Sequence, residues 1–332
     1  MEISDNRFTN SFDFLRLLGA IGIIYVHSYD LLRRDKLEIT VVILAIFFTV
    51  SGYFIAGSAE KSRSLKNYLW KRLLRIQPLL VVVCFLSVLV IGPLFTEWSV
   101  SDYFKSGSSW SYLRTIVPAL GIQFQLPGVF EHNIGERGVN GSLWTLIIEE
   151  RVYLMIGLLF LVQYRRKQWF IAFVAGLNIL YLLNYYRVGG LQLGVLDNYA
   201  TQYYVLFFNG ALCYFLRIPF HRINQVVTIC IVAVIYYLAR NTIGATLFIL
   251  PLLILLIGSR KTVFSGTAKR GDITYGLYVL SFPVQQMLIH LSKNSIQPAV
   301  LFITTLVICT PLAYLSWHFL EKQFLKLRYL VQ

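Results

Sequence analysis

The stretch ITVVILAIFFTVSGYFIA occupies residues 39–56 and contains no charged side chain. A run of about 20 predominantly apolar residues is long enough to cross the hydrocarbon core of a bilayer as an α-helix. This segment is therefore the first indication that the chain is an integral membrane protein.

The rest of the chain has the same character. Of its 332 residues, 57% are hydrophobic and 14% are charged, whereas soluble proteins carry roughly 45–50% apolar and about 25% charged residues. Such a chain cannot cover a water-facing surface. We predict an all-α, polytopic fold with about ten transmembrane helices in a single domain over residues 1–332. The expected helices lie at 12–30, 39–56, 76–95, 143–163, 168–186, 198–216, 222–239, 242–258, 273–291 and 298–319.

The excess of basic residues predicts the orientation. Lys and Arg number 30 against 16 Asp and Glu, a net charge of +14, and basic residues of membrane proteins gather in cytoplasmic loops. With the N-terminus inside, 19 basic residues fall on the cytoplasmic side and 9 on the outer side. The first group includes Arg7, Arg165, Arg166 and Arg222, and the second includes Arg34, Lys36 and Arg240. We therefore expect both termini in the cytoplasm and no nucleic-acid partner.

The apolar runs themselves bear on two further expectations, concerning a signal peptide and the cysteines. No cleavable signal peptide is expected, because Asp13 and Arg16 interrupt the first run. The four cysteines lie in apolar runs without metal-ligand spacing, so we expect them to be small buried hydrophobic residues and expect no metal site.

The longest segment outside the runs, 97–142, falls on the outer side, and its middle, 110–125, is expected to form a short interfacial or re-entrant helix. Loops of this length are often functional.

Ionisable residues inside the first run are functional candidates, because a charge at the bilayer centre costs several kcal/mol. Arg16 and His27 are eleven residues apart, which places them on one helix face about 16 Å apart along the axis. Asp13 and Arg16 are three residues apart and can pair. The alternative is that Arg16 is a boundary residue and His27 a hydrogen-bonded structural histidine.

The run at 143–163 carries Glu149, Glu150 and Arg151 near its outer end. Glu149 lies about two turns in, at a depth that can match His27. A carboxylate bonded to one imidazole nitrogen would fix the tautomer, and the other nitrogen could then act as a general base toward a hydroxyl. An interhelical salt bridge is the alternative.

The basic segment 57–75 ends with Arg72 and Arg75, three residues apart on an expected helix. Their guanidinium groups can therefore converge on one anion. Orientation alone explains the earlier basic residues of the segment. It explains less well two arginines that run directly into the apolar residues from Ile76 onward.

Five motifs occur in order along the whole chain. They are Asp13-Phe14-Leu15-Arg16 followed by His27; Phe47-Phe48-Thr49-Val50-Ser51-Gly52-Tyr53; Arg72-Leu73-Leu74-Arg75 with Pro78; Trp144 with Glu149 and Tyr153; and Thr274-Tyr275-Gly276-Leu277-Tyr278 with Trp317 and Glu321. Together they resemble the signatures of the acyltransferase-3 family of polytopic membrane acyltransferases. Gln77 stands where that family often has a tyrosine. Each motif alone is weak, but five in order are a specific signal.

The resemblance implies transfer of an acyl group, usually acetyl from acetyl-CoA, to a sugar hydroxyl. The acceptor would be a surface polysaccharide, such as the O-antigen of lipopolysaccharide, or a lipid-linked glycan, and the protein would lie in the bacterial cytoplasmic (inner) membrane. It also implies that His27 is catalytic and that Glu149 supports it. Arg16, Arg72 and Arg75 would serve the donor.

The chemistry that these residues permit is a direct transfer. Arg72 and Arg75 hold the phosphates of the donor, and His27 removes a proton from the acceptor hydroxyl. We expect three residues before and at the start of the fourth run to contact the acceptor or the oxyanion, namely Asn140, Ser142 and Trp144. For the first two, a turn or a helix cap is the alternative.

Other functions are compatible with the same residues. A glycan exporter or flippase would also place Arg, His and Glu along a transport path. A non-catalytic scaffold would leave the aligned Arg16 and His27 without a purpose. Within the acyltransferase interpretation, a covalent acyl-enzyme relay is the alternative to direct transfer.

Overall fold

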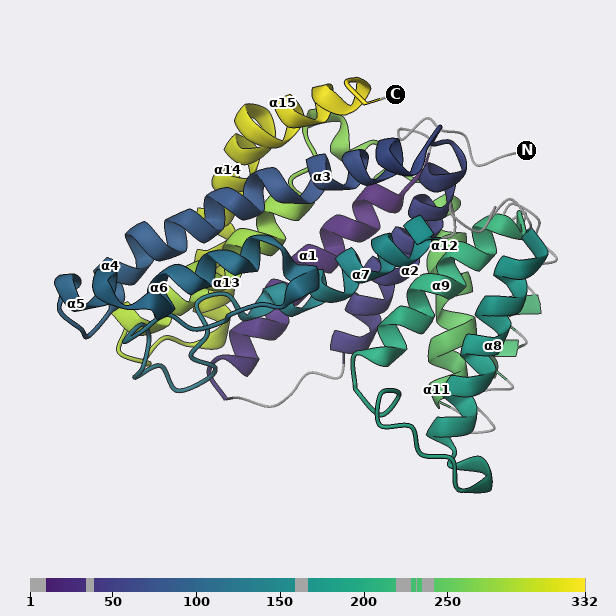
Figure 1. The fold of residues 1–332 in the computed structure, drawn as a ribbon, viewed down its shortest axis with the longest axis horizontal. Helices are drawn as coiled ribbons and strands as arrows, with labels where there is room; N and C mark the ends of the chain where they lie inside the picture. The colour runs from purple at the N-terminus through teal and green to yellow at the C-terminus, as the bar shows by residue number, and fades with distance from the viewer. Residues whose placement is uncertain are drawn as a thin grey trace. The chain divides into compact units, whose positions relative to one another are not determined.

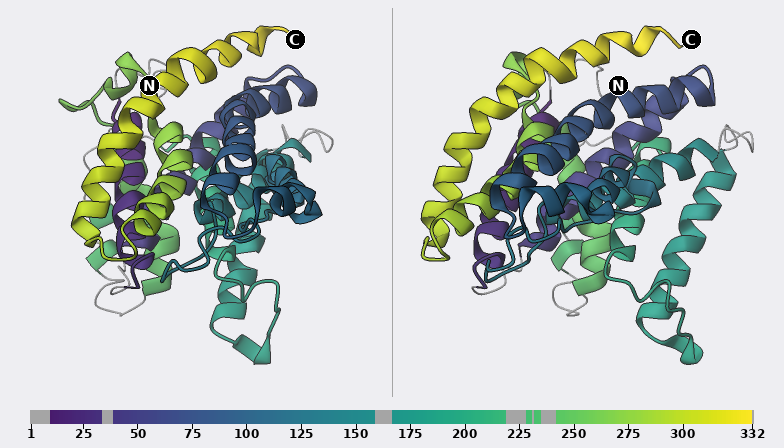
Figure 2. Two further views of the ribbon diagram at one scale, coloured as in Figure 1. Left: turned by 90° about the vertical axis from the view of Figure 1, so that its left-hand side faces the viewer. Right: turned by 60° about the vertical axis from the view of Figure 1, so that its left-hand side comes forward.

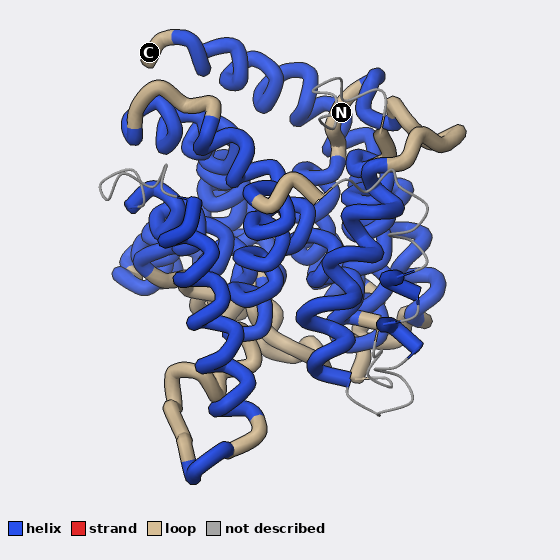
Figure 3. The backbone as a smooth tube through the Cα atoms, turned by 90° about the vertical axis from the view of Figure 1, so that its right-hand side faces the viewer, coloured by secondary structure: helices blue, strands red, loops and turns tan. Residues whose placement is uncertain are grey.

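The computed structural model describes residues 10–33, 39–158, 167–218, 228–230, 232–234 and 242–331. Within these ranges the chain is helical and contains no strand, apart from one isolated antiparallel bridge between Thr96 and Val129 (Figures 1 and 3). The prediction of an all-α fold is confirmed. Outside the described residues lie most of the expected helix at 222–239 and several basic residues used to predict the orientation: Arg7, Arg34, Lys36, Arg165, Arg166, Arg222 and Arg240.

The long helices are α1 (Phe12–Asp30), α2 (Thr40–Glu60), α3 (Leu65–Leu86), α7 (Trp144–Leu158), α8 (Lys167–Tyr185), α9 (Thr201–Phe215), α12 (Leu250–Ser259), α13 (Thr274–Leu291) and α14 (Pro298–Ser316). Most of the long helices coincide with the expected apolar runs, but α3 begins at Leu65, eleven residues before the expected start at 76. Three of them are extended through π-helical turns. The extensions are η2 (Ser87–Ile91) and α4 (Gly92–Phe95) after α3; α11 (Thr242–Gly244) and η7 (Ala245–Ile249) before α12; and η9 (Trp317–Glu321), α15 (Lys322–Leu325) and η10 (Lys326–Tyr329) after α14.

Five helices in the described part of the chain are long and apolar enough to cross a membrane. They are Thr40–Glu60, Leu65–Phe95, Gln168–Tyr185, Thr242–Ser259 and Pro298–Tyr329. The remaining long helices are shorter or carry more polar side chains. The chain therefore has the helices of a multi-pass membrane protein.

The helices form two units. Unit 1 comprises Met1–Arg16, Val41–Leu69 and Val152–Ala268, and unit 2 comprises Leu17–Thr40, Trp70–Arg151 and Lys269–Gln332. Boundaries fall within α1, α3 and α7 and after the first residue of α2, so these four helices contribute residues to both units.

In unit 1, α2 and α9 approach each other through glycines. A β-carbon on Gly52 would lie 1.9 Å from the carbonyl oxygen of Phe207, and one on Gly210 would lie 2.2 Å from that of Thr49. Small residues allow helices to approach closely in a membrane, where van der Waals packing holds them together. The glycine of the FFxxSGY-like segment is therefore a packing residue.

In unit 2, α13 and α14 form a helical hairpin, and α14 continues into the C-terminal α15 (Figure 2). A β-carbon on Gly276 would lie 2.8 Å from Cβ of Ala313, so the two helices also pack closely at this point. This hairpin positions α13, on which the candidate site is built.

The long segment between α4 and α7 follows α3 within unit 2. It contains α5 (Val100–Lys105), α6 (Gly107–Ser111) and the 3-10 turns η3 (Tyr112–Ile116), η4 (Pro118–Leu120) and η5 (Gly141–Leu143). The hydroxyl of Tyr103 donates to the carbonyl of Val88 at 2.9 Å. Further along, the N–H of Ala119 donates to Glu150 at 2.8 Å, and the same carboxylate accepts from Gln77 at 2.9 Å. The turn at Ala119 therefore lies near Gln77. Since the long segment begins after Phe95, it returns along α3 by about 27 Å, the axial length of the 18 residues from Gln77 to Phe95.

The prediction of buried cysteines holds for three of the four. Cys84, Cys213 and Cys309 are buried, but Cys230 is exposed and the prediction is wrong there. The physical reason is that an apolar run in a membrane protein can face lipid as well as protein.

Candidate functional site

One face of α13 carries the residues around which the candidate site of unit 2 is built. Tyr275, Tyr278, Phe282, Gln285 and Gln286 follow at helical spacing and therefore share a face. They extend over about 16 Å of the helix axis. All five are buried except Tyr278, which is half-buried.

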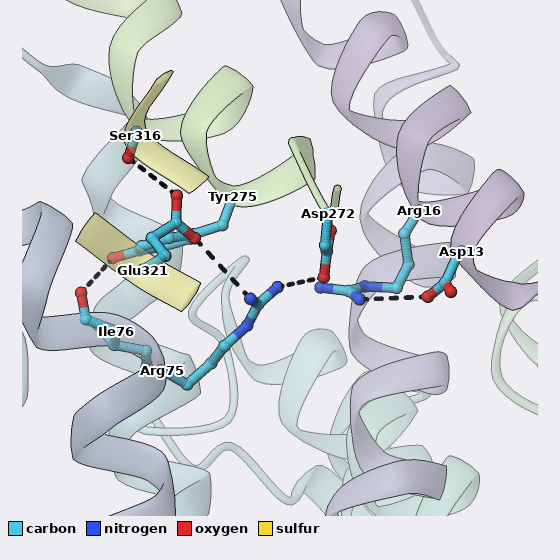
Figure 4. Close-up of polar contacts among 8 residues, drawn as sticks. All are labelled: Asp13, Arg16, Arg75, Ile76, Asp272, Tyr275, Ser316 and Glu321. Carbon is cyan, nitrogen blue, oxygen red and sulfur yellow. Dashed lines mark hydrogen bonds and ion pairs between the residues drawn. The ribbon is translucent and has the colours of Figure 1, made fainter. Parts of the chain in front are cut away.

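At the first turn of this face, two carboxylates hold Arg75 of α3 (Figure 4). Its Nη2 donates to Oδ2 of Asp272 at 2.6 Å, and its Nη1 lies 3.8 Å from Oε2 of Glu321. Both carboxylates are buried, and Ser316 donates a hydrogen bond of 2.9 Å to the other oxygen of Glu321. The guanidinium therefore neutralises two buried negative charges.

Aromatic side chains complete the surroundings of Arg75. Its guanidinium carbon lies 6.0 Å from the ring centroid of Tyr275 and 5.8 Å from that of Trp317, within reach of cation–π attraction. The hydroxyl of Tyr275 donates to the carbonyl of Ile76 at 2.8 Å. The arginine motif and both parts of the last motif, at Tyr275 and at Trp317 with Glu321, thus meet at one place.

Sequence reasoning missed Asp272. The signal for it was a single acidic residue between a basic segment and an apolar run. Nothing in that pattern shows that its partner is Arg75, which lies 197 residues earlier in the chain.

Of the two other predicted donor-site arginines, Arg16 exposes 27% of its side chain, more than the 19% of Arg75. Arg72 lies one turn before Arg75 on α3 and is half-buried. Arg16 belongs to unit 1, and its Nη1 lies 3.8 Å from Oδ1 of Asp13, which confirms the predicted pair (Figure 4).

The second turn of the α13 face meets the start of α7. Tyr278 donates a short hydrogen bond to the backbone oxygen of Ser142, and Oγ1 of Thr145 lies 2.5 Å from the tyrosine oxygen. Glu149, one helical turn after Thr145, interacts electrostatically with Tyr275 and Tyr278. The predicted carboxylate is therefore close enough to the tyrosines of α13 for their charges to interact.

The side chains of Asn140 and Ser142 form hydrogen bonds to other groups of the protein. Both are fully buried; Asn140 donates to the carbonyl of Val279 at 2.9 Å, and Ser142 donates to Asn140 at 2.7 Å. These bonds fasten the entry of α7 to α13. Trp144, the first residue of α7, is half-buried. A contact of these residues with the acceptor stays a prediction.

His27 lies at the third turn of the α13 face. Its half-buried ring packs edge-to-face on Phe282, with the ring centroids 5.1 Å apart. Gln285 donates to the carbonyl of Ile24 at 2.9 Å and to the hydroxyl of Ser28 at 2.8 Å, on either side of His27 in the chain. Since the carbonyl can only accept, this network sets the orientation of the amide. Its Oε1 is buried and has no hydrogen-bond partner among the described residues.

The three consecutive charged residues of α7, Glu149, Glu150 and Arg151, have different partners. Glu150 holds the backbone of Ala119 and the side chain of Gln77, and Nε of Arg151 donates to the carbonyl of Ala119 at 3.4 Å. The sequence indicates that these charges need partners, and the structure provides them for Glu150 and Arg151 in the backbone of Ala119 and, for Glu150, also in Gln77 of α3.

Metal ligands do not gather in the described part of the chain. No group of three or more His, Cys, Asp or Glu side chains among those residues is placed to hold a metal ion.

Comparisons with known proteins identify the family of the chain. Residues 9–318 match the acyltransferase-3 family, described as an acyltransferase domain. The chain is 26% identical over 332 residues to an O-acetyl transferase of Shigella phage Sf6, with 96% of each chain covered. It is 25% identical over 352 residues to nodulation protein 10 of Rhizobium leguminosarum bv. viciae, with 96% of this chain and 94% of that protein covered. No solved structure matches. The chain therefore belongs to the acyltransferase-3 family and is a membrane acyltransferase.

Proposed function

We propose that the protein transfers an acetyl group from cytoplasmic acetyl-CoA to a sugar hydroxyl of a surface polysaccharide or lipid-linked glycan. The family and the phage relative named O-acetyl transferase support acetyl as the acyl group. We further propose a location in the bacterial inner membrane, with about ten membrane-spanning helices and both termini in the cytoplasm. The distribution of basic residues supports that orientation.

The observation that carries the proposal is the continuous face of α13. It joins the Arg75 cluster at Tyr275 to the imidazole of His27 at Phe282. Seven residues separate the two contact points, or about 10 Å of helix. An arginine and an imidazole thus border one helix face inside one unit, and this supports a reaction in which one side of the site binds a phosphorylated donor and the other activates a hydroxyl.

On the donor side, we assign the phosphates of acetyl-CoA to Arg72 and Arg75, and Arg16 to the same function. Arginine is suited to this because its planar guanidinium binds phosphate through two hydrogen bonds. Asp272 and Glu321 support Arg75 by fixing the position of its guanidinium.

On the acceptor side, His27 is the general base. It removes the proton of the sugar hydroxyl while the oxygen attacks the thioester carbonyl. The carbon–sulfur bond then breaks, and the imidazolium returns the proton to the leaving thiolate. Glu149 supports the histidine through its negative charge, which favours the imidazolium. We assign Asn140, Ser142 and Trp144 to the adjoining contact with the acceptor.

The test uses purified protein in lipid nanodiscs, labelled acetyl-CoA and surface glycan from the host cell. We expect label in the glycan with the wild-type protein and none with a folded His27→Ala protein. His132→Ala is the matched control, because His132 is exposed and pairs with Glu97 at 2.9 Å. Normal transfer by His27→Ala would exclude the general base.

The same assay separates the alternatives. An exporter or flippase predicts neither transfer nor hydrolysis of acetyl-CoA by the wild-type protein. An acyl-enzyme relay predicts labelled protein after a short exposure to acetyl-CoA without glycan. An unchanged KM for acetyl-CoA in Arg72→Ala would remove that arginine from the donor site.

A further inference from the structure

A short loop at residues 132–141 is fastened to α13 by one buried amide. Gln286 is fully buried, and its Nε2 donates to the backbone oxygens of Glu136 at 2.5 Å and Gly138 at 2.7 Å. Its Oε1 accepts a hydrogen bond of 2.8 Å from Asn133. One side chain of α13 thus determines the path of this loop, which we call the 132–141 loop.

The 132–141 loop is also held at the ends of two helices. Asn294, just after α13, accepts from the backbone N–H of Ile134 at 3.0 Å. Gly135 passes so close to the end of α1 that a β-carbon there would lie 2.2 Å from the carbonyl oxygen of Leu31. The N–H of Leu31 in turn bonds to the carbonyl of His27, one helical turn earlier. The loop is therefore a rigid element seated next to the turn that carries His27.

This rigid loop presents the carboxylate of Glu136 to a wall of the candidate site. A β-carbon on Gly141 would lie 2.7 and 2.8 Å from the two carboxylate oxygens, and 2.6 Å from Cζ of Phe282. A β-carbon on Gly138 would lie 3.2 Å from Oε1. Two glycines thus leave the space that the carboxylate occupies. Phe282 is the ring against which His27 packs, so one aromatic ring separates the carboxylate region from the imidazole.

The surroundings of this carboxylate favour a ligand that donates hydrogen bonds. Glu136 is an exposed residue, and partial desolvation by the neighbouring protein atoms raises its pKa. Among the residues that the structure describes none bonds to its carboxylate. The carboxylate oxygens are therefore open to a ligand, and carboxyl groups with a perturbed pKa are concentrated at functional sites. The hydroxyl groups of a sugar are neutral donors of the required kind.

We propose that Glu136 is an acceptor-binding residue, whose carboxylate receives hydrogen bonds from sugar hydroxyls next to the one that His27 activates. The inference rests on the proposed function and deepens it. The rigid loop sets the distance from the carboxylate to the imidazole, and Glu136 therefore selects which hydroxyl of the sugar ring reaches His27. The ligand class is a neutral polyhydroxylated ring.

The experiment measures KM separately for donor and acceptor in nanodiscs, with surface glycan from the host cell as the acceptor. Glu136→Gln keeps the shape of the side chain but weakens its acceptor strength. We expect the KM for glycan to rise about tenfold or more. The KM for acetyl-CoA and the rate of acetyl-CoA hydrolysis without glycan should stay within about twofold of the wild-type values. Glu131→Gln is the matched control, since Glu131 is an exposed carboxylate in the adjoining stretch of chain.

Two outcomes would overturn the inference. One is a KM for glycan in Glu136→Gln that equals that of the control. The other is a parallel rise in both KM values, which would indicate a general distortion of unit 2. If Glu136→Gln does not fold, Glu136→Asp replaces it in the test. Aspartate keeps the charge but is one methylene group shorter, so the carboxylate no longer reaches the sugar, and the KM for glycan alone must rise. Failure of the proposed function is a different result, because the wild-type protein itself would then transfer no acetyl group.

Discussion

Replacement of Arg75 by alanine should destabilise unit 2 strongly. The change leaves two carboxylates without their cation, and Asp272 and Glu321 expose only 4% and 2% of their side chains. Breaking a buried ion pair by removing one partner costs about 3–5 kcal/mol. Most of that cost should come from Asp272, which is bonded to the guanidinium at 2.6 Å, whereas Glu321 is 3.8 Å away.

A second substitution tests this explanation. Asp272→Asn removes one stranded charge, so Arg75→Ala/Asp272→Asn should be less destabilised than the sum of the two single variants. Residues in one ion-pair network typically couple by about 0.5–3 kcal/mol, and this pair should lie toward the upper end. If Arg75 bound only the donor, Arg75→Ala would unfold like the wild-type protein and Asp272→Asn would restore nothing.

The assay is denaturant unfolding in detergent micelles, followed by tryptophan fluorescence, for the wild-type protein, both single variants and the double variant. The KM for acetyl-CoA is measured on the same preparations below the unfolding transition. Additive effects of the two substitutions on the free energy of unfolding would refute the reasoning. A raised KM for acetyl-CoA in a stable Arg75→Ala protein would assign the residue to donor binding alone.

Three further outcomes follow from the structure. Gly52→Ala places a β-carbon 1.9 Å from the carbonyl oxygen of Phe207 and should lower the free energy of unfolding by about 1–3 kcal/mol. Gly176→Ala is the control, because nothing lies within 4 Å of its β-carbon, and it should raise the free energy of unfolding by up to about 1 kcal/mol. Glu150→Ala removes the acceptor of a backbone N–H and should lower the unfolding free energy by about 1–3 kcal/mol in the same denaturant titration. Partial desolvation raises the pKa of Glu136, so folding favours its protonated form, and the wild-type protein should lose stability relative to Glu136→Gln as the pH rises from the ordinary glutamate pKa through the raised one. Melting temperatures from pH 4 to 7 that run parallel for the two proteins would contradict that last expectation.

Much of the architecture could be predicted from local patterns. The positions of α1, α2, α8, α13 and α14 follow from the length and composition of apolar runs, because in a bilayer the backbone must satisfy its hydrogen bonds within each helix. Pairing of Asp13 with Arg16 is equally local, since residues three apart on a helix are neighbours. His27, Glu149 and Arg16 are candidates because charge is expensive in a membrane, and Arg72 and Arg75 are candidates because residues three apart on a helix can converge on one anion.

Other features were decided by the tertiary structure alone. Arg75 meets Asp272, His27 meets Phe282, and Gly52 meets Phe207 only after helices distant in the sequence have packed. The physical reason lies in the solvent: lipid is as apolar as a leucine face, so hydrophobic periodicity does not indicate which helix packs on which. Composition therefore determined that this is a membrane protein and which charged residues are costly to place in the bilayer. Close packing at small residues and the pairing of buried polar groups determined the partner of each.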